Sequence, residues 1–319
     1  GSTGRVIPVV ASPTSVEKRS VMSDEWVFTS RQEKLAKARA AVSDVWGAVP
    51  KYYSHAVLVQ VGMPYRDPGE GTRSFTRSSG PYSLRMEAGA LPRSSGGFVE
   101  VGLPFGPRAR LLLLHLSAVA VKHQSPVVEI SDSFTAFARD LGLSTGGRNL
   151  ASLRAQLNRM SVVSMRLAKH ADGFSEVFQG SVFRRLVAET PNDPRQIPLW
   201  ASEVEFSAEY FESLCRNAVP LRREAIQALK HSSRAMDIYA YLAHRLYRVE
   251  KPLTLSWSSL SYQFGDPGKP NRMWKSAFKA ALKQVLVVYP EAKVEPVYGG
   301  IVLKQSPPPV RRKARALIV

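Results

Sequence analysis

The sequence predicts an α+β fold: two tandem winged helix-turn-helix domains that follow a partly flexible N-terminal region. Hydrophobic residues make up 44% of the 319 residues, which is enough for two domains of ordinary size. Residues 108–206 follow the order helix, strand, helix, tight turn, helix and hairpin, which is the order of a winged helix-turn-helix. A similar order returns about 125 residues later, over residues 233–304.

Changes in composition along the chain mark the expected segments. They are a flexible N-terminal arm (1–30), an N-terminal extension of helix, short strands and loops (31–100), a first winged-helix domain (101–206), a second winged-helix domain (207–306) and a basic tail (307–319).

The extension has one strong helical signal and few strand signals. Ser30 can cap an Ala-rich helix over 31–46, and the β-type run at 55–61 predicts a short strand. Glycine, serine, proline and arginine dominate residues 63–97, so we expect loops there with one strand over 82–86.

Each predicted domain contains the same kinds of elements. The first has a helix at 108–121, a strand at 127–130, a helix at 134–141, a glycine-rich break at 143–147, a helix at 148–160, a hairpin wing of 162–169 and 176–187, and a last strand at 199–206. The second has a helix at 233–249, a strand at 253–255, a helix at 258–264, a break at 265–270, a helix at 271–287 and a hairpin wing of 293–297 and 301–304.

The helix predicted over 148–160 has two distinct faces. Leu150, Leu153, Leu157 and Met160 recur at helical spacing and are expected in the core. The other face has no acidic residue and carries side chains of the types that bind base edges and phosphates. These candidate DNA-binding residues are Arg148, Asn149, Ser152, Arg154, Gln156 and Arg159.

The helix predicted over 271–287 carries a row of lysines. Its expected buried stripe is Trp274, Ala277, Phe278, Ala281, Leu282 and Val285. Lys275, Lys279 and Lys283 follow one another at i, i+4 and i+8, again without an acid. A solvated helix usually mixes both signs, so the row favours phosphate or guanine contact over a plain surface face. Further candidates nearby are Lys269, Asn271 and Arg272.

The charge of the chain agrees with a polyanionic partner. The formal net charge is +18, and residues 207–319 hold 19 Lys and Arg against 8 Asp and Glu. Charge alone allows DNA, RNA or an anionic membrane, and the order of elements favours duplex DNA. Arg184 and Arg185, in the first predicted wing, could contact phosphates, or they could be ordinary exposed residues.

No catalytic constellation is visible. The Gly-Lys pair at 268–269 lacks the spacing of a phosphate-binding loop, and the six histidines include no His-hydrophobe-His pair that would supply the metal ligands of a nicking enzyme. The single Cys215 suits a reducing cytoplasm, and no apolar run is long enough to cross a membrane. We expect a cytoplasmic protein that is not an enzyme and needs no cofactor or metal.

Several motifs resemble the plasmid-encoded RepA replication initiators of Gram-negative bacteria. In the first half they are GLPFGPRARL (102–111), SFTAFA (133–138), LGLSTGG (141–147) and LRAQL (153–157). In the second half they are LRREAIQAL (221–229), SRAMDIY (233–239) and LAHRL (242–246). The resemblance covers roughly residues 95–300, whereas residues 1–90 match no family.

The resemblance implies a function that composition and spacing do not. Such proteins bind directly repeated sites, called iterons, in duplex DNA at a plasmid origin, open an adjacent A/T-rich region and recruit the host replicative helicase. It also implies contact with a host initiator, plasmid copy control, and a homodimer that represses its own gene. A transcriptional repressor built from the same units stays an alternative, and an origin nickase or primase is disfavoured by the missing catalytic groups.

Overall fold

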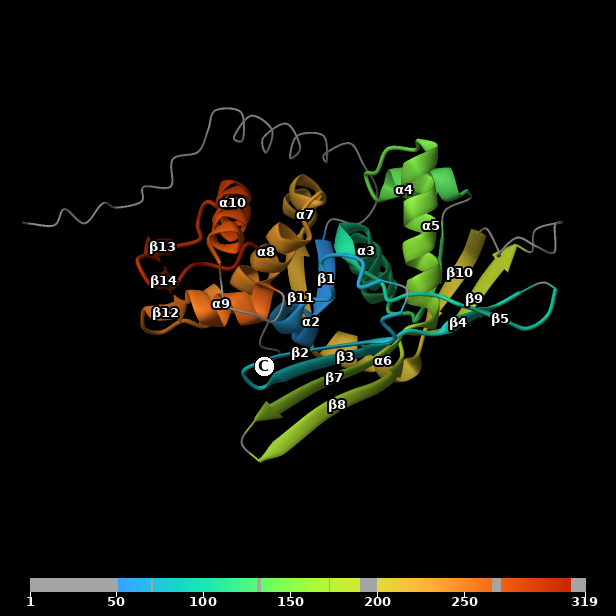
Figure 1. The fold of residues 1–319 in the computed structure, drawn as a ribbon, viewed down its shortest axis with the longest axis horizontal. Helices are drawn as coiled ribbons and strands as arrows, with labels where there is room; N and C mark the ends of the chain where they lie inside the picture. The colour runs from blue at the N-terminus through green and yellow to red at the C-terminus, as the bar shows by residue number, and fades with distance from the viewer. Residues whose placement is uncertain are drawn as a thin grey trace, which may run out of the picture.

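The fold is a mixed α+β arrangement of helices and several small antiparallel sheets, as the sequence predicts (Figure 1). This computed structural model describes residues 51–69, 71–93, 95–130, 133–171, 173–189, 200–265 and 271–310. The predicted helix at 31–46, the candidate Lys269, the N-terminal arm and the tail beyond residue 310 lie outside the described residues.

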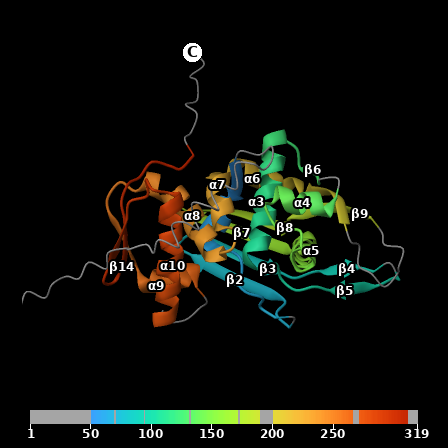
Figure 2. The same cartoon turned by 90° about the horizontal axis from the view of Figure 1, so that it is seen from above.

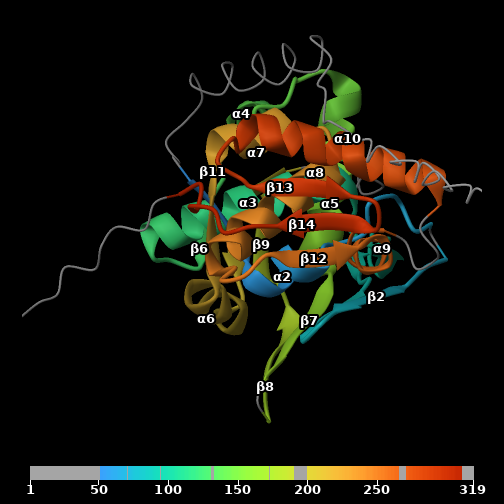
Figure 3. The same cartoon turned by 90° about the vertical axis from the view of Figure 1, so that its left-hand side faces the viewer.

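Two parts of the chain share one order of elements. The first unit contains α3 (Gly106–His123), β6 (Val127–Glu129), α4 (Phe134–Asp140), α5 (Gly147–Val162), β9 (Phe183–Glu189) and β10 (Trp200–Phe206). The second unit contains α8 (Ser233–Arg245), β12 (Leu253–Ser256), α9 (Trp257–Phe264), α10 (Arg272–Val288), β13 (Val294–Val297) and β14 (Gly300–Leu303). Their three-stranded sheets, β6-β10-β9 and β12-β14-β13, have the same antiparallel strand order. Figure 3 shows the second unit with α10 above its sheet.

The hairpin predicted as the first wing belongs to another sheet. Its strands β7 (Ser164–Ala171) and β8 (Phe174–Ser181) join β2 (Ser74–Ser79) and β3 (Tyr82–Glu87) in the order β2-β3-β7-β8. The single strand predicted over 176–187 is therefore two strands, β8 and β9, in two sheets. The physical reason lies at Val182 and Phe183, which are both buried. Neighbouring residues of one strand point to opposite faces, so the chain has to turn there.

The N-terminal extension contains more regular structure than expected. The strand predicted at 82–86 is confirmed as β3, but residues 63–97 also contain β2, β4 (Ala90–Pro92) and the start of the hairpin to β5 (Phe98–Glu100). The strand predicted at 55–61 is wrong: β1 (Lys51–His55) ends there and α2 (Ala56–Val61) follows. Val57 to Val61 are all buried, and a short apolar run does not distinguish a buried helix from a strand.

One continuous core joins these elements. Strand β1 pairs with β11 (Ala218–Arg222), and α6 (Ala208–Arg216) and α7 (Arg223–Leu229) flank β11 along the chain. The helix predicted to run to residue 249 stops at Arg245 and continues as the 3-10 turn η2 (Leu246–Arg248). Seen from two directions, α3, α7 and α8 lie between α5 and α10, which keeps the two candidate helices apart (Figures 1 and 2).

A buried ion pair connects α3 of the first unit to α8 of the second. The Arg110 guanidinium donates to both carboxylate oxygens of Asp237, at 2.7 and 2.8 Å, and the two side chains are only 5% and 11% exposed. Arg110 also donates to the carbonyl oxygens of Met63, Pro64 and Gly106. Position 62 is glycine because a Cβ atom there would come within 2.3 Å of the Asp237 carboxylate. This cluster therefore fixes the segment before β2 and both units at one point.

His55, which is buried, and His115, which is partly buried, predict how stability depends on pH. His55 caps α2, and His115 on α3 lies edge-on between the rings of Tyr52 and Phe137. Burial lowers the pKa of each imidazole to about 4, whereas the unfolded chain takes up these protons near its ordinary pKa of 6.5. Their contribution to stability is therefore complete above about pH 6.5 and is lost as the pH falls from there to about 4.

We expect the free energy of unfolding in urea to fall by about 2 kcal/mol per histidine between about pH 7 and pH 5. His115→Phe should remove part of this slope, because phenylalanine cannot take up a proton. Equal slopes for the variant and the unchanged protein would contradict this account.

Candidate nucleic-acid interface

Helix α10 presents the predicted row of basic residues. Lys275, Lys279 and Lys283 are partly exposed, Arg272 is exposed, and the first turn of the helix holds no acid. The opposite side is buried as predicted at Phe278, Ala281, Leu282 and Val285, except that Ala277 is exposed and Trp274 half-buried. We call Arg272, Lys275, Lys279 and Lys283 the α10 surface.

Asn271 has a structural role at the start of this helix. Its side-chain oxygen accepts a hydrogen bond of 2.8 Å from the backbone N–H of Trp274, so it caps α10. The cap uses one lone pair of the carboxamide oxygen, and the amino group can donate to a base or a phosphate.

Trp257, the first residue of α9, connects α10 to the neighbouring hairpin. Its indole N–H donates to the Tyr298 carbonyl at 3.1 Å, and its backbone N–H donates to the Gly299 carbonyl at 2.9 Å. The Lys279 ammonium lies 5.7 Å from the centre of the same indole ring. Trp257 thus places the β13–β14 turn beside the α10 surface, with the Tyr298 side chain fully exposed at the tip.

The face predicted for α5 is largely occupied by contacts within the protein. The expected outward position of Gln156 is wrong: its side chain is 4% exposed, and its oxygen accepts a hydrogen bond of 2.9 Å from the Phe105 N–H. Arg159 forms an ion pair with Asp67 at 3.2 Å, donates to the Leu103 carbonyl and stacks over the Phe105 ring. Both side chains hold α5 against the segment that precedes α3.

The remaining α5 candidates lie in its N-terminal half. Arg154 stacks over the Phe134 ring of α4, and Asn149 accepts from Arg108 at 2.6 Å and donates to Ser144. Ser152 is half-buried, and Arg148 is exposed beside Gly146 and Gly147. No side chain caps this end and no acid lies in its first turn, so Arg148 and the N-terminal end of the helix dipole form its most accessible basic feature.

Arg184 and Arg185 lie on β9, in the sheet β6-β10-β9 and not in the β7–β8 hairpin. Both side chains are exposed, at 72% and 62%, and they form ion pairs with Glu205 and Glu203 of β10. Pairing with carboxylates lowers the positive potential that they offer to phosphates, so this sheet is a weaker anion surface than α10.

The described residues contain no group of three or more His, Cys, Asp or Glu side chains placed to hold a metal ion. Across the same parts of the chain, no helix combines the length and apolar character that a membrane span requires.

Two tryptophans near the α10 surface give a matched pair of variants. Trp257→Phe removes the N–H that holds the Tyr298 carbonyl, and we expect roughly 1 kcal/mol lower stability and roughly tenfold weaker DNA binding. Trp274→Phe removes a buried N–H for which the described residues offer no acceptor, so stability should stay the same or rise. Urea unfolding and fluorescence anisotropy with duplex DNA measure both effects. Equal losses for the two variants would mean that the Trp257 hydrogen bond does not position the hairpin.

Residues 103–259 match the family model described as plasmid encoded RepA protein. Over this segment the chain is similar to the RepA family. The RepA segment begins before α3 and ends within α9, so it contains all of α5 and stops short of α10 and the β13–β14 hairpin. The resemblance drawn from the sequence is confirmed over these residues.

Two crystal structures of domains 2 and 3 of RctB are similar in fold. One, of selenomethionine derivatives, has a TM-score of 0.48 at 11% identity, covering 82% of this chain and 94% of that chain. The other has a TM-score of 0.45 at 11% identity, covering 77% and 94%. No curated protein sequence matches this chain.

Proposed function

We propose that this protein is a plasmid replication initiator that binds directly repeated duplex DNA sites, or iterons, at its origin. The observation that carries the proposal is the RepA segment at residues 103–259, followed directly by a basic helix and a hairpin held beside it. The protein acts by binding and not by catalysis, and it needs no metal or cofactor for this.

We infer that both units are winged helix-turn-helix units. In each, two successive helices follow an edge strand, and an antiparallel pair of strands completes the sheet. Helices α5 and α10 take the place of the recognition helix that enters a major groove. The pairs β9–β10 and β13–β14 are the wings, so Arg184 and Arg185 lie on a wing after all, although on a different one from that predicted.

The two units contribute unequally to binding. Side chains of α5 such as Gln156 and Arg159 are engaged within the protein, so this unit binds phosphates through Arg148 and the N-terminal N–H groups of α5. The α10 surface offers four basic side chains and supplies most of the electrostatic affinity. Because both units belong to one chain, the second binding event is intramolecular.

Two different units in one chain favour directly repeated sites over a palindrome, because a palindrome matches two identical units related by a two-fold axis. The proposal also includes four further properties. They are opening of an A/T-rich region, recruitment of the host helicase, contact with a host initiator, and a homodimer that represses its own gene. They follow from the RepA family and not from a feature of the surface.

Selection of bound duplexes from plasmid and random DNA tests the proposal. We expect tandem direct repeats from an origin, with a nuclease footprint of about two helical turns per monomer, because groove sites on one face recur every ~10.5 bp. A palindrome near a promoter would show a transcriptional repressor instead. Metal-dependent nicking of a supercoiled origin plasmid would show an enzyme, and a footprint of one turn would mean that only one unit binds.

A further inference from the structure

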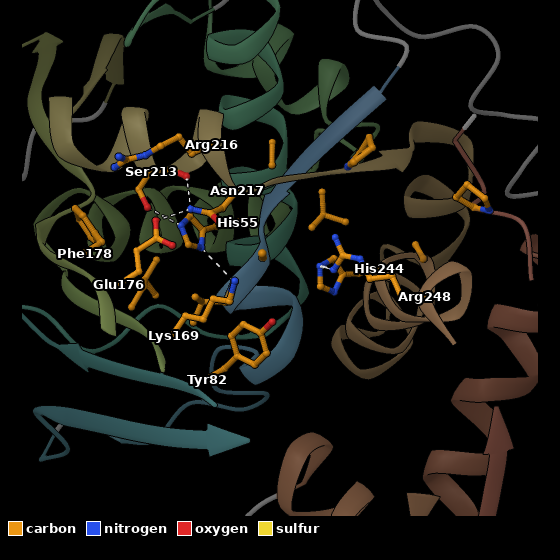
Figure 4. A pocket seen from close by; sticks show the side chains of 18 of the residues that line it. His55, Tyr82, Lys169, Glu176, Phe178, Ser213, Arg216, Asn217, His244 and Arg248 are labelled. Carbon is orange, nitrogen blue, oxygen red and sulfur yellow. Dashed lines mark hydrogen bonds between the residues drawn. The ribbon is translucent and has the colours of Figure 1, made fainter. Parts of the chain in front are cut away.

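A cavity of about 190 Å³ lies between the four-stranded sheet, α6 and the end of α8 (Figure 4). The sheet forms one wall, the C-terminal turn of α6 another, and the residues from His244 to Arg248 a third. None of the candidate DNA-binding residues lines it. It is therefore separate from the proposed DNA interface.

Strand register explains why the sheet wall is polar. Leu84, Leu167 and Phe178 are paired across β3, β7 and β8 and are buried in the core. Two residues further along the strands, the same face carries the paired row Tyr82, Lys169 and Glu176. This second row reaches beyond the core and lines the cavity.

The α6 side of the cavity is well ordered by hydrogen bonds. The Nδ1 atom of His55 accepts from the Val57 N–H, so Nε2 carries the proton and donates to the Ser213 hydroxyl at 2.9 Å. Burial lowers the pKa of His55 to about 4, so it is uncharged near neutral pH. Asn217 donates to the Glu176 carboxylate at 3.0 Å, which engages the single acidic side chain of the lining.

Two cations approach the cavity from opposite walls. Lys169 points in from the sheet and Arg248 from the turn after α8 (Figure 4). The Arg248 guanidinium lies 4.9 Å from the centre of the Tyr247 ring and contacts the His244 imidazole. A third cation, Arg216, lies at the rim, so the lining holds three cations and one carboxylate.

We propose that this cavity binds a small phosphate monoester between Lys169 and Arg248. A phosphate monoester carries nearly two negative charges at neutral pH, which matches the excess of cations, and guanidinium and ammonium groups are its usual partners. The rings of Tyr82 and Tyr247 and the nearby Phe178 give an apolar surface for the organic part. The volume is below the ~300–1,000 Å³ of sites for drug-sized ligands, so the ligand is small.

The site also has a structural consequence. Lys169 belongs to the four-stranded sheet, and Arg248 follows α8 of the second unit. A dianion held by both side chains connects these two parts, so its binding should stabilise the whole protein.

Thermal shift and calorimetry on the full chain test the proposal with three probes: inorganic phosphate, glycerol 3-phosphate and adenosine monophosphate. Chloride at matched ionic strength serves as the reference. We expect a saturable rise in Tm with at least one ester, and tighter binding of that ester than of inorganic phosphate. Lys169→Gln and Arg248→Gln should each weaken this binding about tenfold or more.

Arg166→Gln is the matched control. Arg166 lies on the same strand as Lys169 but on the other face, where it pairs with Glu87, and its loss should leave the affinity unchanged. Circular dichroism checks that each variant is folded, and DNA binding is measured separately, so the two proposals can fail independently. Three outcomes would overturn the proposal. They are an unchanged Tm with every probe at millimolar concentration, unchanged binding in both cavity variants, and binding of inorganic phosphate as tight as that of the esters.

Discussion

Replacing Lys275, Lys279 and Lys283 together with alanine is expected to weaken duplex DNA binding about 100-fold or more at ~0.1 M salt. Each phosphate contact releases about 0.9 counterion, so the slope of log K against log salt should become shallower by almost three units. The loss should be similar for specific and non-specific DNA, because lysine binds phosphate as a point charge and discriminates bases poorly.

A triple variant elsewhere separates local contact from net charge. Lys51, Lys122 and Lys251 lie on β1, at the end of α3 and before β12, and belong to neither candidate helix. Their replacement by alanine removes the same charge and should change the salt slope far less. Anisotropy titrations over a range of salt concentrations compare the two variants. If both lose affinity equally, overall charge and not the α10 surface carries the binding.

Asp237→Ala is expected to destabilise the protein by roughly 3–5 kcal/mol, the largest effect on stability that we expect from a single substitution. The substitution leaves the Arg110 guanidinium 5% exposed and without its carboxylate, at the point where α3, α8 and the segment before β2 meet. A large shift of the urea unfolding midpoint is the measurement.

The pair can also be removed as a whole. Arg110→Met with Asp237→Leu replaces both charges with apolar side chains, and it should recover much of the lost stability, because no unpaired charge is then buried. The carbonyl oxygens of Met63 and Pro64 lose their donor in this double variant, so recovery should be incomplete. A double variant less stable than Asp237→Ala would show that the arginine contributes more through these carbonyl groups than through the ion pair.

Local patterns in the sequence predict much of the fold. The periodic apolar residues of α5 and α10 predict both helices to within one or two residues at each end, and the order of elements predicts the second unit throughout. All four residues of the α10 surface are among the residues predicted from the sequence, whereas the further candidate Lys269 lies outside the described residues. These features depend on residues close together in the chain, where side-chain spacing follows directly from helix or strand geometry.

The position of polar side chains on α5 depends on distant residues. Gln156 has the spacing of an exposed position. Its side chain is buried because it accepts a hydrogen bond from the N–H of Phe105, which is 51 residues away in sequence. Arg159 is held in the same way by Asp67, 92 residues away. A polar residue is buried when a partner satisfies its hydrogen bonds, and no local pattern shows where that partner is.

The sequence by itself determined the α+β class, the helices of the two units, the basic character of α10 and the RepA resemblance, because periodicity, charge and motifs depend on neighbouring residues. Only the tertiary structure decided which strands pair, which hairpin completes the first unit, and how Trp257 brings the β13–β14 tip to α10. It also decided that Lys169 and Arg248 meet at one cavity. The reason is physical: pairing and burial join residues that are far apart in the chain, and their energy depends on the whole packed core.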